Sequence, residues 1–296
     1  MSWFSVPSDT EEASKGNGGK NRCCEAQCGY ASTTGPEGLS LKAERMDFEY
    51  NALKLVSSNL ALSTVVGVPH VHAYDPRTHT LIMSDLAPFQ LLSNALQEGD
   101  DKVVSRIGRA LGEFMGRFHK WTSLPEHADT RKRFLENEAS REDLLDYRWK
   151  LAISGAKRYG LGHDWMAEMR DEGMRDAKLG GPVVCMGDFW CSNILVSTGG
   201  DLKLYINRLG NRTPMPFMRE FFKAYTTHMH LDKAHLALNV GRDLLSFGID
   251  ASWLLHSDGD VKRSIAQTGL ELLEAARTGD KKALSRNPAL ADMYRI

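Results

Sequence analysis

The chain has 296 residues, of which 42% are hydrophobic and 25% are charged, and its formal net charge is −1 at pH 7. This composition is typical of a globular protein with one large core or two modest lobes, and it lacks the basic excess of a nucleic-acid-binding surface. No apolar run reaches the length of a membrane span, and the N-terminus does not have the pattern of a signal peptide. We therefore expect a cytoplasmic protein with no membrane or nucleic-acid partner.

Residues 1–40 are rich in Gly, Ser, Lys, Glu and Asn and follow neither a helical nor a strand period, which predicts an irregular, disordered segment. Cys23, Cys24 and Cys28 lie in this segment without a fourth metal ligand nearby, so free thiols are favoured over a zinc site. The later cysteines, Cys185 and Cys191, are expected to be buried thiols.

A small mixed lobe is predicted over residues 41–88. Met46, Tyr50 and Leu53 recur at helical spacing, and the runs 71–74 and 80–83 flank a turn in the pattern of a β-hairpin. The residues that follow, 85–88, are expected to lead out of this small sheet.

A larger, mainly helical lobe is predicted over residues 89–296. Its clearest element is an apolar stripe at helical spacing from Val103 to Phe118, ending near His119. A strand pair is expected at 194–197 and 202–206. Further helices are predicted at about 141–154, 163–171, 234–247 with Gly248 as its cap, and 261–276 ending at Gly279.

The motif that carries chemistry runs from Val183 to Val196. It places Asp188 five residues before Asn193, and an apolar strand-like run follows. In a kinase catalytic loop this spacing lets the aspartate orient the acceptor hydroxyl while the asparagine holds a magnesium ion beside the phosphates. The next predicted strand ends in Asn207, where a second metal-binding aspartate would be expected.

The chain resembles the aminoglycoside phosphotransferase and choline kinase-like family, including fungal members. The resemblance is carried by Gly-Asp-Phe-x-x-x-Asn at 187–193, by Leu-Gly-Glu-Phe-Met-Gly-Arg-Phe-His at 111–119 and by the helix around Glu49. Val68-Pro69 followed by Leu-Ile-Met-Ser-Asp-Leu at 81–86 also matches. These segments occur in the family's order.

This resemblance implies an α+β, protein-kinase-like fold and an ATP-dependent transfer of phosphate to a small-molecule hydroxyl. Asp188 would be the catalytic base, and Asn193 and Asn207 would hold Mg²⁺. Glu49 would pair the ATP-binding lysine. ATP would also contact a strand and hinge formed by Ser84, Asp85 and Leu86. The oligomeric state and the acceptor are not predicted.

The chain departs from the family pattern at three places. Met186 stands where the family has a histidine, Asn207 replaces an aspartate, and no lysine-bearing strand is evident before Glu49. Two alternatives therefore stay open beside an active kinase: a catalytically inactive pseudokinase that binds a nucleotide or a partner, and a sequence from which coding segments have been lost. Glu49 could equally be a solvated helix residue.

Overall fold

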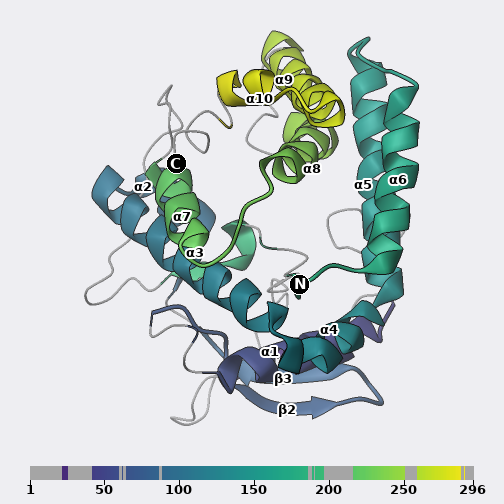
Figure 1. Ribbon diagram of the computed structural model, residues 1–296. Coiled ribbons are helices and arrows are strands. Elements are labelled where there is room, and N and C mark those ends of the chain that lie inside the picture. Colours follow the sequence, from purple (N-terminus) through teal and green to yellow (C-terminus); the bar gives the residue numbers. More distant parts are fainter. Residues whose placement is uncertain are drawn as a thin grey trace, which may run out of the picture. The chain divides into compact units, whose positions relative to one another are not determined.

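The computed structural model describes residues 22–25, 42–59, 62, 65–86, 89–185, 189, 191–196, 216–250, 259–287 and 290. The described part is mostly helical with a few short strands (Figure 1). The strands are β1 (Arg22–Glu25), β2 (Val71–Asp75), β3 (Thr80–Ser84), β4 (Gln90–Leu91) and β5 (Leu195–Val196). The helices are α1 (Arg45–Ser57), α2 (Leu92–Glu98), α3 (Asp101–Ser123), α4 (Ala128–Leu135), α5 (Glu138–Arg158), α6 (Trp165–Leu179), α7 (Pro216–Thr226), α8 (Lys233–Ser246), α9 (Gly259–Thr278) and α10 (Lys281–Arg286).

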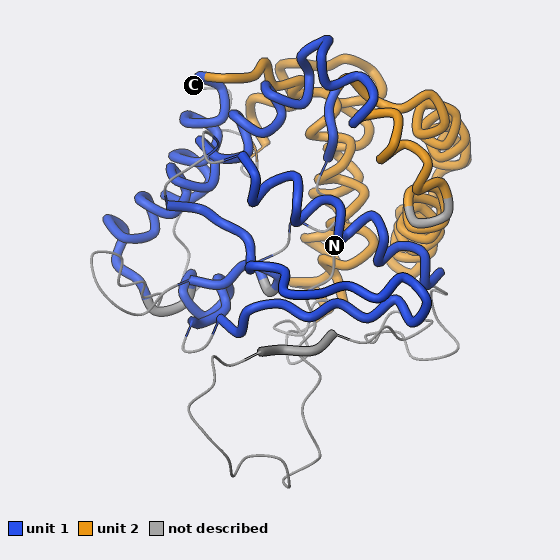
Figure 2. The backbone as a smooth tube through the Cα atoms, turned by 90° about the horizontal axis from the view of Figure 1, so that it is seen from below, with its two compact units in different colours: residues 1–130, 183–227 blue, residues 131–182, 228–296 orange. Residues whose placement is uncertain are grey.

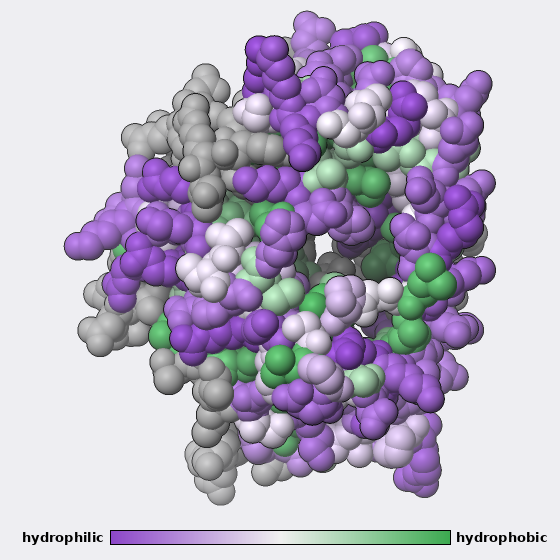
Figure 3. All heavy atoms as spheres, in the orientation of Figure 1, coloured by the Kyte–Doolittle hydropathy of each residue, from purple (hydrophilic) through white to green (hydrophobic). Residues whose placement is uncertain are grey.

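The chain divides into two compact units, coloured separately in Figure 2. The first unit contains residues 1–130 and 183–227, and the second contains residues 131–182 and 228–296. Each unit is therefore built from two separate stretches of the chain, and each is described by itself below. On the face shown in Figure 3, hydrophilic side chains predominate and hydrophobic ones form small separate areas. No helix in the described ranges is long and apolar enough to cross a membrane.

The predicted β-hairpin is confirmed, and it forms two strands of a three-stranded antiparallel sheet in the order β1-β3-β2. The third strand, β1, corrects the expectation of an irregular segment at its own four residues only. Its four residues, Arg-Cys-Cys-Glu, include no lysine. Its pairing with β3 is a long-range contact, which local sequence periodicity does not reveal.

Helix α1 packs on this sheet through Met46 and Leu53, which are fully buried against Leu81 and Met83 of β3. A polar contact adds to this packing. The Tyr74 hydroxyl on β2 donates a hydrogen bond to Asp47 of α1. Burial, together with this bond, raises the pKa of Tyr74 well above its usual value, so the hydroxyl stays protonated as the donor.

Helices α3 and α7 pack together unusually closely in the first unit. Gly108 and Gly112 lie one turn apart on α3, where the backbone of Phe217 and Phe221 on α7 would overlap any Cβ atom. Only glycine lets two helix backbones approach this closely. The apolar stripe predicted on α3 is confirmed, since its members from Val104 to Phe118 are buried on this side. Sequence analysis did not identify α7.

The second unit contains α5, α6, α8 and α9 around a separate core that includes Trp149, Met166 and Leu273. Gly279 has a φ of +69° just after α9, as expected for a helix-ending glycine. The same role for Gly248 is wrong: α8 ends at Ser246, and Gly248 begins a short 3-10 helix without a positive φ.

The close approach of α3 and α7 can be tested with Gly112→Ala. The new methyl group would overlap the backbone carbonyl of Phe221, which cannot rotate away. We expect a loss of about 3 kcal/mol from overpacking, offset by roughly 1 kcal/mol of helix propensity. Urea denaturation should therefore show a net loss of unfolding free energy of about 2 kcal/mol.

The matched control is Gly173→Ala in the interior of α6, where the nearest atom to a Cβ is Trp149 Nε1 at 3.5 Å. This control should be neutral or stabilised by up to about 1 kcal/mol. Equal stability of Gly112→Ala and the wild type would show that α3 and α7 do not depend on this close contact.

Candidate functional site

Five of the seven predicted site residues lie in the described part of the first unit: Glu49, Ser84, Asp85, Leu86 and Asn193. The other two, Asp188 and Asn207, lie outside the described residues, and so does Met186. The site is therefore built here from the described residues that flank Asp188 and from the elements that hold them.

The chain entering the predicted catalytic loop is attached to α3. The backbone N–H of Val184 donates a hydrogen bond of 3.2 Å to the hydroxyl of Thr122, whose side chain is completely buried. The Thr122 hydroxyl itself lies 3.0 Å from the carbonyl oxygen of Phe118. A buried backbone N–H needs such a partner, so this bond holds Val184 four residues before Asp188.

The chain leaving the loop is attached to the segment that follows β3. Cys191–Asn193 form one turn of 3-10 helix, and β5 then pairs antiparallel with β4. The backbone N–H of Leu92 extends this pairing with a 2.7 Å bond to the carbonyl oxygen of Ile194. The strand pair thereby joins the residues after Asn193 to the residues after Leu86.

The connection from β3 to β4 is short. The backbone N–H of Phe89 donates a 2.8 Å bond to the carbonyl oxygen of Leu86, which closes a turn immediately before β4. At the other end, Ser84 is held by its backbone N–H, 2.8 Å from the His70 carbonyl oxygen, and by its hydroxyl, 3.1 Å from Nε2 of His72. Ser84, Asp85 and Leu86 thus lie within one short connection that leads directly to the strand beside Asn193.

The β4–β5 pair exposes two apolar side chains that sequence analysis did not single out. Leu91 and Leu195 are directly opposite each other in the register and are 37% and 41% exposed. Opposed residues project from the same face of a sheet, so the two leucines form a small apolar surface. Val196, the next residue, projects to the other face and is buried in the core. The residues after Asn193, Ile-Leu-Val, are all apolar, so the sequence did not indicate which of them would be exposed.

Glu49 occupies the buried face of α1 together with Met46 and Leu53 and is 5% exposed. The alternative of a solvated helix residue is therefore wrong. Its carboxyl group therefore belongs to the face of α1 that packs on the sheet. Lys42 is exposed, as expected.

Behind the loop, His119 of α3 and Tyr225 of α7 form a hydrogen bond of 2.9 Å between Nδ1 and the hydroxyl. Burial lowers the pKa of His119, which favours the neutral ring. Burial, and secondarily the nearby thiol of Cys185, raise the pKa of Tyr225. A protonated tyrosine hydroxyl beside a neutral imidazole either donates to Nδ1 or accepts from it, according to the tautomer of the ring. Cys185 is exposed as a residue, but its sulfur is desolvated, which raises the pKa of the thiol, so the expected burial holds for the thiol and not for the residue.

The described residues include no group of three or more His, Cys, Asp or Glu side chains able to hold a metal ion. Asn193 offers an amide oxygen, which is the type of donor that Mg²⁺ accepts. Asn193 is the one predicted magnesium ligand among the described residues, and its amide oxygen fits this ion by chemical type.

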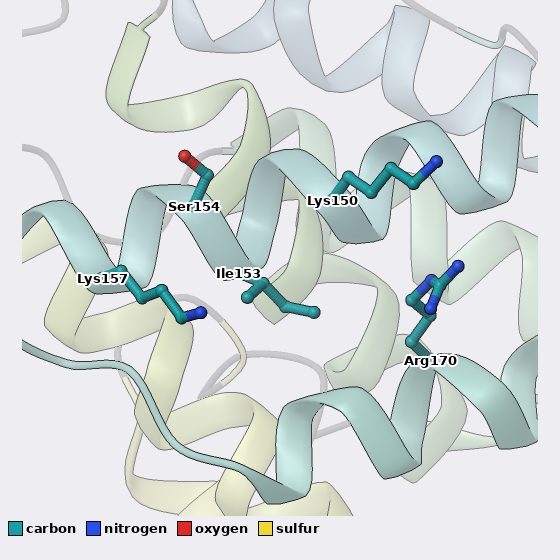
Figure 4. A pocket seen from close by; sticks show the side chains of 5 residues that line it. All are labelled: Lys150, Ile153, Ser154, Lys157 and Arg170. Atoms are coloured by element: carbon teal, nitrogen blue, oxygen red, sulfur yellow. The ribbon is translucent and has the colours of Figure 1, made fainter.

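The second unit has a pocket of about 400 Å³ lined by Lys150, Ile153, Ser154, Lys157 and Arg170 of α5 and α6 (Figure 4). Two of its cations are already used, because Lys150 and Arg170 both form ion pairs with Asp146. These contacts, with the hydrogen bonds from both cations, lower the pKa of Asp146 in spite of its partial burial. The network joins α5 to α6 and offsets part of the positive charge around the pocket, to which Lys157 also contributes.

Comparison with known proteins gives two kinds of match. The sequence pattern of the phosphotransferase enzyme family matches residues 35–203, which is more than half of the chain. A 4-hydroxytryptamine kinase from Psilocybe cyanescens is 28% identical over 165 residues, covering 53% of this chain and 45% of that protein. The phosphotransferase FrzJ from Cladobotryum sp is 25% identical over 167 residues, covering 49% of this chain and 43% of that protein. The matched part thus spans less than half the length of these curated relatives.

The lowered pKa of His119 makes the stability of the protein depend on pH. Below the ordinary histidine pKa of 6.5, the unfolded chain binds a proton at this residue that the folded chain refuses. The free energy of unfolding should therefore fall as the pH drops through 6.5, and this contribution should level off below the folded pKa.

Urea denaturation from pH 8 to 5 would measure this dependence in the wild type and in His119→Gln, whose amide does not titrate. We expect the wild type to lose more unfolding free energy than the variant over this interval. The difference should equal the free-energy equivalent of the lowering of the His119 pKa. Parallel stability curves for the two proteins would contradict a buried, neutral His119.

Proposed function

The chain belongs to the phosphotransferase enzyme family, and on that premise we propose that it transfers the terminal phosphate of ATP to a hydroxyl group of a small molecule. Asp188 would act as the base that orients the acceptor hydroxyl. Phosphoryl transfer needs little covalent chemistry from the protein beyond such positioning and the neutralisation of charge. The reaction is therefore compatible with a site built on one loop and one short strand pair.

The observation that carries this proposal is the β4–β5 pair. Its hydrogen bonds connect the segment of Ser84, Asp85 and Leu86 to the strand that follows Asn193. A nucleotide whose base contacts that segment would have its phosphates within reach of a metal at Asn193. One backbone element thus relates the proposed base-binding edge to the proposed metal ligand.

We assign the apolar surface of Leu91 and Leu195 to the adenine ring. Both side chains are partly exposed beside the connection from β3, and a flat heteroaromatic ring would cover them. Glu49, buried on α1 next to the sheet, would pair with the cation that contacts the phosphates.

Asn193 and Asn207 would hold magnesium through their amide oxygens. Bound there, the ion would supply charge neutralisation for the transferred phosphate. Replacement of an aspartate by Asn207 removes one negative charge from the donor set, so we expect weaker retention of the ion than in a site with two carboxylates.

The proposal extends to the fold and to the location of the protein. A protein-kinase-like arrangement would have its nucleotide-binding lobe at residues 41–88, its catalytic and substrate lobe at residues 89–296 and an accessory segment at residues 1–40. Such a protein would act in the cytoplasm on a diffusible acceptor. The relative named 4-hydroxytryptamine kinase makes a hydroxylated aromatic amine a reasonable first acceptor to try, beside aminoglycosides and choline.

A second candidate function is favoured by a specific feature, the residues Met186 and Asn207 at two positions of the catalytic motif. A pseudokinase would bind Mg-ATP or a partner without turnover. A longer transcript that encodes a lysine-bearing strand or an aspartate in place of Asn207 would instead favour an active kinase derived from a fuller sequence.

The central test is Asp188→Asn. Loss of a positioned base should lower kcat by about 10²- to 10⁴-fold while leaving Mg-ATP binding intact. Turnover is measured as ADP release with the acceptors above, and binding as the thermal shift at millimolar Mg-ATP. The matched control is Asp164→Asn, an exposed aspartate just before α6 whose side chain makes no capping bond.

Three outcomes separate the candidates. A thermal shift with turnover that Asp188→Asn abolishes supports the kinase. A thermal shift without turnover on any acceptor supports the pseudokinase. Absence of any shift at millimolar Mg-ATP would contradict the kinase and the nucleotide-binding form of the pseudokinase, and would leave the partner-binding form.

The adenine assignment is tested by Leu195→Asn. Leu195 is 41% exposed, and covering that share of a leucine side chain contributes about 1 kcal/mol, so a polar replacement should weaken Mg-ATP binding by about fivefold. Leu179→Asn, at an 80% exposed leucine on α6, is the control and should bind as the wild type does. Equal dissociation constants for all three proteins, measured by calorimetry, would remove the adenine ring from this surface.

A further inference from the structure

One face of α7 packs beside Phe189, which directly follows Asp188, and lies within electrostatic range of Cys185, which precedes Asp188. On one side, Tyr225 lies close enough to Cys185 for the thiol to affect the pKa of the tyrosine. On the other side, the ring of Phe189 lies 6.0 Å from that of Phe221. Phe221 and Tyr225 are themselves stacked, with ring centroids 6.3 Å apart. Cys185 precedes Asp188 by three residues and Phe189 follows it directly.

Tyr225 is in turn held by His119 of α3. In addition to the hydrogen bond of 2.9 Å, the two rings meet edge to face with centroids 5.6 Å apart. His119 Nε2 is buried and has no hydrogen-bond partner among the described residues. The bond to Tyr225 is therefore the hydrogen bond that orients this imidazole, and through it α3 sets the position of the Tyr225 ring.

This bond is not needed to attach α7 to α3. The two helices already meet backbone to backbone at Gly108 and Gly112, and Arg109 forms a 2.8 Å ion pair with Glu220. One hydrogen bond contributes only about 1 kcal/mol net to stability. In an interface that other contacts already hold together, its main effect is therefore to orient the two side chains.

Resting on the proposed function, we propose that His119 and Tyr225 are positioning residues: their hydrogen bond fixes the α7 aromatic face beside Phe189, the residue that directly follows Asp188. Neither residue touches the reacting atoms in this assignment. Met186, the first residue after Cys185, cannot supply such a brace from within the loop, because its thioether is at most a weak hydrogen-bond acceptor.

Three variants separate the bond from its surroundings. Tyr225→Phe keeps the ring and removes the hydroxyl. His119→Gln places its amide near the position of Nε2 and loses the atom at Nδ1, whereas His119→Asn places its amide near Nδ1 and can keep the bond to Tyr225. Tyr225→Phe and His119→Gln should therefore behave alike, and His119→Asn should resemble the wild type.

The first measurement does not depend on any enzymatic activity. The rate at which a maleimide labels Cys185 is followed by peptide mass spectrometry, with Cys191 as the internal comparison. Desolvation of the sulfur raises the pKa of the Cys185 thiol in the wild type and limits its thiolate fraction. Loss of the bond should accelerate labelling of Cys185 about fivefold and leave Cys191, which packs on the core around Leu92 and Val196, unchanged.

The second measurement is steady-state kinetics with whichever acceptor the wild type phosphorylates. Displacement of the loop should lower kcat by about tenfold or more in Tyr225→Phe and His119→Gln, with little change in KM for Mg-ATP. His119→Asn should recover most of kcat. A purely structural role would instead lower the melting temperature of each variant in proportion to its loss of activity.

The two proposals fail in distinguishable ways. If the wild type transfers no phosphate, the labelling rates still decide whether the pair positions Cys185. If the wild type is active but Cys185 is labelled at the same rate in all four proteins, the positioning role is overturned while the proposed function stands. Equal kcat in Tyr225→Phe and the wild type overturns it as well.

Discussion

The approach of α7 to the bare backbone of α3 is the contact on which the candidate site depends. Glycine at 108 and 112 removes the side chains that would hold the two helices farther apart. Because α7 lies so close, Tyr225 reaches His119 and Phe221 reaches Phe189, the residue directly after Asp188. A wider spacing between α3 and α7 would break these contacts together, since all of them extend from the same helix face.

The β4–β5 pair is a very small element that is stabilised by its contact with the core of the first unit. A strand pair of two residues each would not persist alone in water. Here one face is covered by the core around Leu92, Val104 and Phe217, into which Val196 projects. The opposite face keeps Leu91 and Leu195 partly exposed. The same element is therefore anchored by burial on one side and available for a ligand on the other.

Local patterns were sufficient to predict several elements. The hairpin of β2 and β3 follows from alternation around a turn, and α3 follows from an apolar stripe that extends over several turns. Strand β1, helix α7 and the pairing of β4 with β5 were not predicted. The strand expected at 194–197 is confirmed at β5, whereas its expected partner at 202–206 lies outside the described residues. Strand β1 and the β4–β5 pair are short and are stabilised by partners distant in sequence. Helix α7 packs through aromatic residues whose spacing along the chain does not indicate which element they contact.

The sequence by itself determined the family, the spacing of Asp188 and Asn193 and the amphipathic character of the long helices, because these are properties of local order along the chain. Only the tertiary structure decided that Glu49 is buried, that Leu91 and Leu195 lie side by side, and that Tyr225 contacts a histidine 106 positions earlier. Contacts of that separation result from the packing of whole elements, and the periodicity of a single segment carries no information about the partner it will meet.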